Sequence, residues 1–571
     1  MKDQVASKYD VLIAGGGLAG LALALQLKHS KPGISILVLE KRESLAEIAT
    51  HKVGESLSEI GAYYLREVVG LKDYLSQHQL RKFGFRFFFS PECSHQLDQR
   101  VEVGSRLDNP FPSHQVDRGL LENEMVRKAN ECGVDILMGA TVREIELSEG
   151  GHTITFEHHH TSRIAKVNWL VDASGRRGLL KRKLNLEKEI GHNINSSWFR
   201  LDVVIDPDDW SEDLEWRSFV APGRRRLATN HLMGKGYWVW IIPLVDGKTS
   251  IGIVADPEFH PFETINSFEK SMLWLEKHEP QAALILGSYI DKQMDFKVMK
   301  SFAYDTKQFY SPERWAVTGE AGAFMDPFYS PGSDMIALGN SWITDMIIRD
   351  LDGEDIKLRA RVFDLAHKEL LGGWIHLYRN MYGVFGNTQI MLMKIVWDWA
   401  SYWAVPAVLS MNNSYTDISF LKKYSSNNAG IGKRFAALNE QMQSLFRSWN
   451  EHEVEPCSQH QLNVFDLVTL KRFQTELGVQ YDQTTIVSKV ETNLAILENI
   501  AAQIFRLVSA SVNGTPANMP VDPYTMSVND GRDTLLEKSK SGNALPVDGV
   551  IREDIAKMWF IRIKSTENEF A

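Results

Sequence analysis

The sequence predicts an α/β fold in three parts: a discontinuous nucleotide-binding domain, an inserted antiparallel β-sheet domain and a mainly helical C-terminal region. Near the N-terminus, a buried-strand pattern runs directly into a glycine-rich turn and then a helix. Residues 197–290 alternate apolar and polar side chains as β-strands do. From about residue 335 nearly every segment has helical period. This order of patterns is typical of a nucleotide-binding domain interrupted by a sheet.

The first element is a strand–turn–helix–strand unit from Tyr9 to Glu40. Its glycines follow the spacing G-x-G-x-x-G at Gly15, Gly17 and Gly20. The first glycine permits a tight turn, the second lets a pyrophosphate approach the backbone, and the third lets helix and strand pack closely. The helix N-terminus presents N–H groups to phosphate. Glu40 ends the second strand, where a carboxylate can accept hydrogen bonds from a ribose diol. This Rossmann-like unit therefore predicts a bound dinucleotide.

The bulk composition is that of an ordinary globular protein. A chain of 571 residues, 44% hydrophobic and 24% charged, is expected to form two or three domains. A net charge of −10 gives no electrostatic reason to bind nucleic acid or an anionic membrane. The three cysteines lack metal-ligand spacing and cannot form a disulfide framework. We therefore expect no metal site, and a reducing, cytoplasmic location without a signal peptide.

The aromatic-rich run 374–411 is a candidate for membrane contact. Arg379, Lys394 and Asp398 interrupt it, so no helix of about twenty uncharged apolar residues exists there. We interpret the run as core or as the wall of a substrate pocket, with an interfacial membrane contact as the alternative.

Several short motifs lie between these elements. Val53-Gly54-Glu55-Ser56 precedes a helix-like segment that ends near residue 80. Residues 80–89 are expected to form one aromatic strand that includes Lys82, and the polar, proline-bearing stretch 90–113 is expected to be a loop. Val116-Asp117-Arg118 leads into a helix.

Two more motifs follow in the second half of the predicted sheet and beyond it. Trp238-Val239-Trp240-Ile241-Ile242-Pro243 is a strand pattern, and its two tryptophans are expected on one face. A return to strand–turn–helix at 315–340 contains Gly319-Glu320 and Asp326-Pro327, followed by Ser330-Pro331-Gly332. The domain boundaries that we predict from this order are 1–80, 111–185 and 295–350 for the nucleotide-binding domain, 81–110 and 186–294 for the sheet domain, and 351–571 for the helical region.

Taken together, these motifs resemble those of the flavin-dependent halogenases, a branch of the FAD-dependent aromatic monooxygenase superfamily, over about residues 8–345. The W-x-W-x-I-P strand is the most distinctive match, and the V-G-E-S segment resembles halogenases that act on phenols and pyrroles. The resemblance implies an FAD-binding domain of the glutathione-reductase and p-hydroxybenzoate-hydroxylase type. It also implies that reduced FAD, dioxygen and halide produce hypohalous acid beside the cofactor.

In this family a lysine holds or polarises the hypohalous acid next to the aromatic substrate. The pattern K-x-G-x-x-F of the family matches Lys82 to Phe87, so the resemblance identifies Lys82 as the catalytic residue. A solvent-facing lysine at a strand edge is the structural alternative, and Lys52, directly before V-G-E-S, is the alternative catalyst.

The resemblance assigns the other site residues as well. Trp238 and Trp240 would shield the cofactor from the substrate, and Gly332 with Ser333 would offer N–H groups to halide. Glu55 is either a buried structural acid or a contact near the flavin. The residues implied to bind FAD are Gly15, Gly17, Gly20, Glu40, Lys52, Arg118, Glu320, Asp326 and Gly332.

Three positions depart from the family pattern. Glu320 stands where the superfamily usually has an aspartate that bonds the ribityl chain of FAD. Tyr329 stands where the tryptophan halogenases carry a glutamate, which argues for phenol- or pyrrole-type substrates. Pro331 lies in the halide segment and has no N–H to donate.

These departures leave three functions open. The first is a halogenase acting on an electron-rich aromatic, free or bound to a carrier protein. The second is an FAD-dependent hydroxylase without a halide site, and the third is a reductase or dehydrogenase of the same fold. Ala173-Ser174-Gly175 replaces a motif that contacts the nicotinamide cofactor in single-component hydroxylases, so a separate NAD(P)H-dependent flavin reductase is expected to reduce the FAD.

Overall fold

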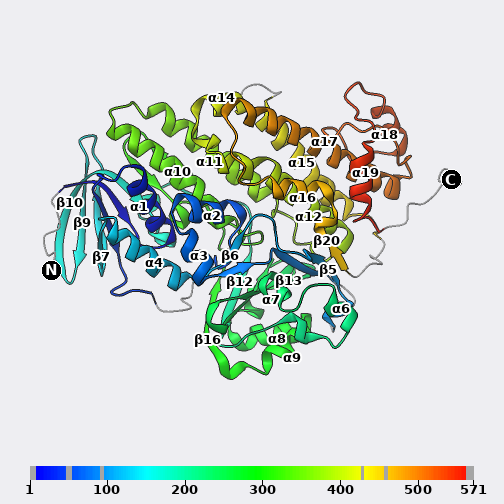
Figure 1. Cartoon of the computed structure of the whole chain (residues 1–571), viewed down its shortest axis with the longest axis horizontal. Helices are drawn as coiled ribbons and strands as arrows, with labels where there is room; N and C mark the ends of the chain where they lie inside the picture. Colours follow the sequence, from blue (N-terminus) through cyan, green and yellow to red (C-terminus); the bar gives the residue numbers. More distant parts are fainter. Residues whose placement is uncertain (1–7, 47–53, 90–95, 426–429, 455–460, 561–571) are drawn as a thin grey trace.

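The computed structural model describes residues 8–46, 54–89, 96–425, 430–454 and 461–560 (Figure 1). Within these residues, the protein has two large sheets and a layer of helices that runs along one side of both (Figure 1). The predicted fold class, with a Rossmann-like domain, a sheet domain and a helical C-terminal region, is confirmed.

The first sheet is built around the N-terminal strand. β1 (Lys8–Ala14) pairs in parallel with β2 (Ile36–Glu40) and with β10 (Thr161–Asp172). The strand order is β18-β19-β10-β1-β2-β7, with β8 and β9 attached beyond β10. Helices α1 (Leu18–Ser30), α4 (Arg118–Glu131) and α10 (Pro331–Leu351) pack together beside it. The remaining strands are β7 (Asp135–Met138), β8 (Ala140–Glu146), β9 (His152–His158), β18 (Tyr310–Ser311) and β19 (Trp315–Val317).

The second sheet is mixed, whereas the sequence predicted an antiparallel one. Its order is β16-β12-β15-β14-β13-β4-β5-β20. Two pairs are parallel, β13 with β4 and β5 with β20, because β4 and β20 come from distant parts of the chain. The strands are β4 (Phe85–Phe89), β5 (Val101–Gly104), β12 (Asn195–Leu201), β13 (Thr229–Gly234), β14 (Tyr237–Pro243), β15 (Thr249–Ala255), β16 (Gln293–Met299) and β20 (Gln461–Asn463).

The single aromatic strand predicted at 80–89 is two strands in two sheets. β3 (Leu80–Lys82) pairs with β6 (Ser113–Gln115), and β4 begins after Gly84. Gly84 has a φ of +74°, and a Cβ there would lie 3.0 Å from the side chain of Asn109, so the chain turns at this glycine. The turn separates Lys82 from the sheet that carries the phenylalanines.

One other prediction of local structure was wrong in part, and a strand joins the second sheet from the predicted helical region. Of the stretch 90–113, which was expected to be a loop, residues 101–104 form β5, because they pair with β4 on one side and with β20 on the other. The C-terminal region is mainly helical, but β20 extends the second sheet from within it. Local polarity could not reveal either pairing, because both depend on a distant strand.

The C-terminal helices form the layer that covers the two sheets (Figure 1). α12 (Thr388–Tyr402) lies at its centre and contacts α15 (Ile431–Trp449), α16 (Val468–Thr475) and α17 (Gln483–Asn513). Among the described helices, α17 alone is long and apolar enough to cross a membrane, and 67% of its apolar window is buried in the protein. The other long helix of the layer is α11 (Lys357–His376), and α18 (Arg532–Lys538) and α19 (Gly549–Ala556) lie near the end of the described chain.

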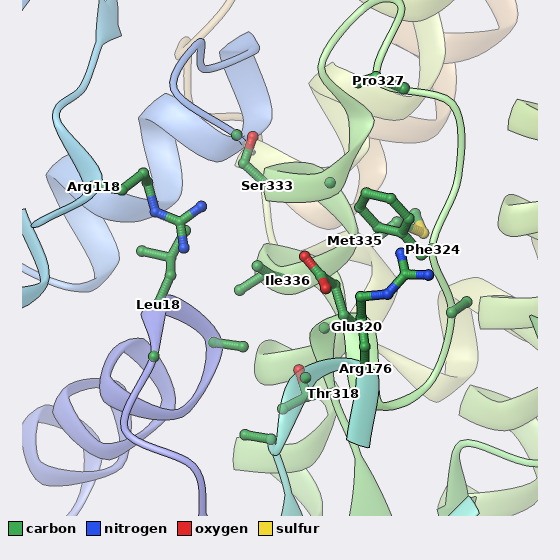
Figure 2. Close-up of a pocket in the computed structure, with 18 of the residues that line it drawn as sticks. Leu18, Arg118, Arg176, Thr318, Glu320, Phe324, Pro327, Ser333, Met335 and Ile336 are labelled. Atoms are coloured by element: carbon green, nitrogen blue, oxygen red, sulfur yellow. The ribbon is translucent and has the colours of Figure 1, made fainter. Parts of the chain in front are cut away.

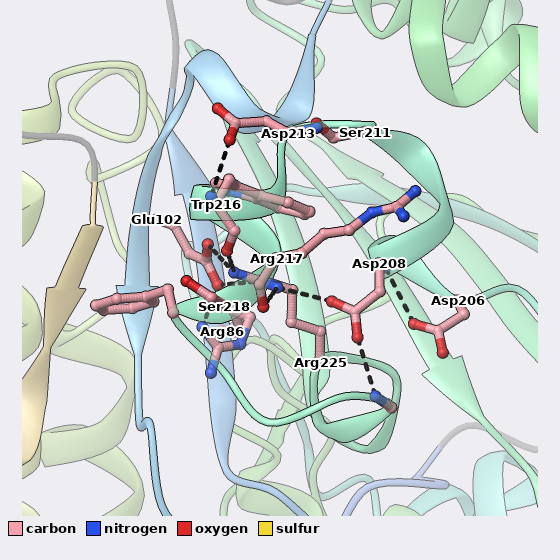
Figure 3. A network of polar contacts seen from close by, with 12 residues as sticks. Arg86, Glu102, Asp206, Asp208, Ser211, Asp213, Trp216, Arg217, Ser218 and Arg225 are labelled. Atoms are coloured by element: carbon pink, nitrogen blue, oxygen red, sulfur yellow. Dashed lines mark hydrogen bonds and ion pairs between the residues drawn. The ribbon is translucent and has the colours of Figure 1, made fainter.

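A buried network of charges fixes the start of β4 (Figure 3). Arg86 and Arg225 both pair with Glu102, and Arg225 also contacts Asp208 at 2.7 Å. The side chains of both arginines and of Glu102 are fully buried. The backbone N–H of Phe83 donates to Leu227 O, so the segment that carries Arg225 is tied to the turn after Lys82.

Candidate active site

A cavity of about 760 Å³ lies where the glycine turn of the first sheet meets one face of the second sheet. Its wall contains most of the residues that the sequence assigned to the cofactor and to shielding. Those that line it are Gly15, Gly17, Glu40, Arg118, Trp238, Trp240, Glu320, Asp326, Gly332 and Ser333. Lys52 lies outside the described residues.

The three glycines occupy the positions that the turn requires. Gly15 has a φ of +124°, and a Cβ on it would lie 2.2 Å from Ala173 O. A Cβ on Gly20 would lie 2.0 Å from Gly15 O, which explains why this glycine packs inside and does not line the cavity. A Cβ on Gly17 would meet nothing within 4 Å and would project into open space. This open space at the start of α1 fits a pyrophosphate.

Glu40 holds the glycine turn in place from the end of β2. Its carboxylate accepts hydrogen bonds from Gly16 N at 2.8 Å and from Arg42 N at 2.9 Å. Arg42, which sequence reasoning missed, donates to Gly16 O at 2.9 Å and lines the cavity. The sequence signal that could have identified Arg42 is its position, as a cation two residues after Glu40 at the end of β2.

Charged side chains project into the cavity from opposite walls (Figure 2). Arg118, at the start of α4, pairs with Glu122 at 3.0 Å. Glu320 faces it from the turn after β19, and Arg176, a second residue that sequence reasoning missed, lies on the same side as Glu320 (Figure 2). Glu55 also lines the cavity, and burial raises its pKa to about 7 although Arg200 lowers it.

The two tryptophans share one face of β14. Trp238 and Trp240 line the cavity, whereas Tyr237 and Val239 face the helices on the other side of the sheet. The indole of Trp240 donates to Ser250 Oγ at 3.1 Å. The alternation predicted for this strand is confirmed.

The segment 329–334 forms a wall between this cavity and a second one. Ser330 to Ser333 line the first cavity, and Tyr329 and Asp334 line the second. Tyr329 and Ser330 have φ values of +97° and +59°, a left-handed conformation that non-glycine residues rarely adopt. α10 then begins at Pro331, so the N–H groups of Gly332 and Ser333 have no partner within the helix.

The second cavity has a volume of about 40 Å³, so an aromatic ring can enter only if lining side chains move. Three carboxylates, of Glu59, Asp334 and Asp398, lie in its wall. Aromatic side chains make up about half of the rest, namely Phe85, Tyr329, Trp374, Trp399, Tyr402, Trp403 and Phe465.

Lys82 lies beside the second cavity and is only 3% exposed. Its Nζ donates to Leu57 O at 2.9 Å and lies 3.5 Å from the centroid of the Phe85 ring. Burial lowers the pKa of Lys82 to about 7, although Glu59 and Asp334 raise it. The alternative of a solvent-facing strand-edge lysine does not fit this burial.

Asp334 is a further residue that sequence reasoning missed. Its carboxylate accepts hydrogen bonds from Ser58 Oγ, from Gly61 N at 2.9 Å and from Tyr402 OH at 2.8 Å. Burial raises its pKa to about 7. Because Ser58 follows Leu57, which accepts the bond from Lys82, this aspartate connects the start of α10 to the lysine.

Comparison with known sequences shows which proteins the chain is similar to. Residues 8–244 match the FAD binding domain family. Flavin-dependent halogenase chlA of Dictyostelium discoideum is 28% identical over 442 residues, which cover 71% of either chain. A 1H-pyrrole-2-carbonyl-(peptidyl-carrier protein) chlorinase of Pseudomonas fluorescens is 27% identical over 57% of this chain and 72% of its own length.

The FAD binding domain and these relatives support a place for the chain among the flavin-dependent halogenases. Solved structures share the fold: halogenase PltM aligns with a TM-score of 0.62 and 16% identity over 86% of this chain and 96% of its own. Flavin-dependent brominase Bmp2 aligns with a TM-score of 0.52 and 21% identity over 67% and 91%. The protein is thus an FAD-dependent enzyme, and the cavity of about 760 Å³ fits its cofactor.

Proposed function

We propose that the protein halogenates a small, electron-rich aromatic substrate through hypohalous acid held by Lys82. The single observation that carries this proposal is the place of Lys82. A buried amine with a pKa of about 7 contacts the wall of an aromatic cavity, and one short segment separates that cavity from the cofactor-sized one. When bound, reduced FAD would react with dioxygen, and this chemistry would oxidise the halide.

In this proposal, different residues near the two cavities bind halide, shield the cofactor and hold the hypohalous acid. The N–H groups of Gly332 and Ser333 lie at the positive end of α10 and can hold a halide ion. Trp238 and Trp240 cover the face of the second sheet that lines the cofactor cavity, and they keep the aromatic substrate away from the cofactor. Lys82 then presents its Nζ to hypohalous acid in a site from which water is excluded, where a hydrogen bond to the acid is stronger than in water.

Removal of the amine tests this proposal. In Lys82→Met, with reduced FAD, dioxygen and bromide, bromination of a phenol probe should fall at least about 100-fold while the FAD content stays at the wild-type level. Lys181→Met is the matched control, because Lys181 is also buried, donates to a backbone oxygen at 3.2 Å and lies 3.7 Å from a tyrosine ring. Bromination that persists in Lys82→Met and depends on enzyme turnover would refute the role of Lys82.

A hydroxylase remains the second candidate, and Pro331 is the observation that favours it. Proline removes one N–H from the segment that would hold halide. An oxygenated product formed by wild-type enzyme without halide would support hydroxylation. Anomalous density for bromide at Gly332 in a soaked crystal would support halogenation.

Two further parts of the proposal concern partners. Relatives named as carrier-protein pyrrole halogenases support a phenol- or pyrrole-type substrate, free or carrier-bound. Ala173-Ser174-Gly175 in place of the nicotinamide-contacting motif supports reduction of FAD by a separate flavin reductase. NADPH oxidation by the protein alone, at the rate of halogenation, would contradict this second part.

A further inference from the structure

Two energetically unfavourable features of the structure meet at one hydrogen bond in the wall of the second cavity. Tyr329 has a left-handed backbone with a φ of +97°, which is strained for a residue with a large side chain. Its hydroxyl donates to Asp398 Oδ2 at 3.1 Å. Both residues line the cavity, so this bond faces the space where substrate would bind.

Asp398 is the second unfavourable feature, because it is half of a buried ion pair on an otherwise apolar helix. Its Oδ2 accepts from Lys394 Nζ at 2.8 Å, and its Oδ1 accepts from Gln443 Nε2 at 2.8 Å. Lys394 also donates to Gln443 Oε1 at 2.7 Å and is fully buried, so it lies behind Asp398 and does not line the cavity. Desolvation of such a pair opposes folding, and well-packed apolar residues would serve stability equally well.

The carboxylate of Asp334, which also lines the second cavity, is held differently from that of Asp398. Asp334 accepts three hydrogen bonds, from Ser58, Gly61 and Tyr402, and although Tyr402 lines the cavity, two further donors hold this carboxylate in place. On its cavity side, Asp398 holds the hydroxyl of Tyr329, whose backbone is strained, and a substrate hydroxyl is chemically equivalent to that group. Because the backbone of Tyr329 is strained, a substrate hydroxyl can displace the Tyr329 hydroxyl from Asp398 more easily than it can displace the donors from Asp334.

We propose that Asp398 is the catalytic base of the reaction, and that it accepts the proton of a ring O–H or N–H on the substrate, which replaces the hydroxyl of Tyr329. This assignment rests on the proposed halogenation. It narrows the substrate class to aromatics with a hydrogen-bond donor on the ring, and it makes Lys394 and Gln443 positioning residues. Lys394 forms an ion pair with the carboxylate, and Gln443 fixes its orientation.

The step balances as an electrophilic substitution by hypohalous acid, the oxidant that the proposed function names. A ring carbon forms the C–X bond while the O–X bond breaks, and the departing hydroxide takes a proton from the Lys82 ammonium to give water. The phenolic proton passes to Asp398 and leaves a halogenated dienone. The ring carbon then loses its proton to Lys82, and Asp398 returns its proton to oxygen, which restores both residues and the aromatic ring.

A phenol and its methyl ether separate the proposed role from a structural one. The ether has no proton to give, so Asp398→Asn should lower phenol bromination by about 100-fold and bromination of the ether by less than about threefold. A thioether scavenger in the solution removes any hypobromous acid that escapes. Equal losses for the two substrates would overturn the proposal, as would a collapse of the phenol-to-ether ratio in Asp334→Asn with an unchanged ratio in Asp398→Asn.

Two further variants keep the test valid if Asp398→Asn folds poorly. Lys394→Met combined with Asp398→Asn removes both charges, leaves no unpaired ion, and should show the same loss of selectivity for phenol. Tyr329→Phe removes the competing hydroxyl, so the KM for the phenol should fall about threefold to tenfold while the KM for the ether stays unchanged. An unchanged KM for phenol would contradict the exchange of hydroxyl groups.

The outcomes also distinguish this proposal from the proposed function. If wild-type enzyme does not brominate either substrate, halogenation itself fails. If wild-type enzyme brominates both, Lys82→Met brominates neither, and Asp398→Asn retains the wild-type ratio, then halogenation stands and the assignment of Asp398 fails.

Discussion

The indole N–H of Trp238 donates a 3.0 Å hydrogen bond to the hydroxyl of Tyr382. That hydroxyl donates in turn to Asp326 at 2.6 Å, and His192 lies 2.9 Å from the same carboxylate. A strand of the second sheet and the turn before α10 are thereby connected through a tyrosine of the C-terminal region. The helical region thus supplies a structural part of the cofactor cavity.

This connection predicts an energetic coupling. Tyr382→Phe should lower the free energy of unfolding by about 1–3 kcal/mol, because it leaves the buried indole N–H of Trp238 without its acceptor and removes one hydrogen bond to Asp326. A double-mutant cycle with Trp238→Phe, measured by chemical denaturation, should give a coupling of about 0.5–3 kcal/mol. Tyr378→Phe is the matched control, because the structure shows no hydrogen-bond partner for this buried hydroxyl among the described residues. A control that costs as much as Tyr382→Phe would contradict the assignment.

Lys82 should make the protein less stable at low pH than at high pH. Its pKa is about 7 in the folded protein against 10.5 for the ordinary side chain, so the folded state binds fewer protons between these values. The cost of the buried charge is therefore fully present below pH 7 and is relieved as the pH rises toward 10.5. Lys82→Met should raise Tm more at pH 6 than at pH 9, as measured by thermal unfolding of the apoprotein. A shift in Tm that does not depend on pH would argue against a titrating Lys82.

The charge network of Figure 3 should contribute strongly to stability. Glu102→Gln leaves Arg86 and Arg225 buried with only Asp208 as a charged partner, at a cost of about 3–5 kcal/mol. Glu131→Gln, which breaks an exposed pair with Arg127, should cost less than about 1 kcal/mol. Urea denaturation of both variants checks the difference, and similar values for the two would refute the role of burial.

Two glycines of the same motif should respond differently to alanine. Gly17→Ala adds a methyl group to open space and should keep the Tm of the apoprotein but weaken FAD binding by about tenfold, or ~1.4 kcal/mol. Gly20→Ala drives a Cβ to 2.0 Å from Gly15 O and should lower the Tm as well. Flavin fluorescence titration with thermal unfolding distinguishes the two effects. Full FAD affinity in Gly17→Ala would place the pyrophosphate elsewhere.

Pro331→Ala should change halide binding and stability in opposite directions. The variant gains an N–H at the positive end of α10, so the KM for bromide should fall about tenfold, or ~1.4 kcal/mol. Loss of the fixed proline φ at this helix position should reduce stability by about 0.4–1 kcal/mol. Steady-state bromination and thermal unfolding measure the two effects. If the KM for bromide does not change, halide does not bind at this helix start.

Sequence patterns predicted the parts of the site that depend on local geometry. The glycine spacing and the acidic strand end identified a nucleotide turn, because such a turn needs small residues at fixed positions. The alternation of tryptophans identified the cavity face of β14, because every second side chain of a strand lies on the same face. The 80–89 strand was predicted wrongly because a single left-handed glycine, Gly84, decides where one sheet ends and another begins.

By itself, the sequence determined the fold class, the dinucleotide turn and the candidate lysine, since each is written in residues close together along the chain. Only the tertiary structure decided what surrounds that lysine. Leu57, Phe85 and Asp334 come from three separate segments of the chain; packing buries the amine against the first two and brings the charge of Asp334 close enough to oppose the fall in its pKa. The pairing of Tyr329 with Asp398 likewise depends on α12 meeting the turn before α10, and local sequence carries no record of contacts between such distant segments.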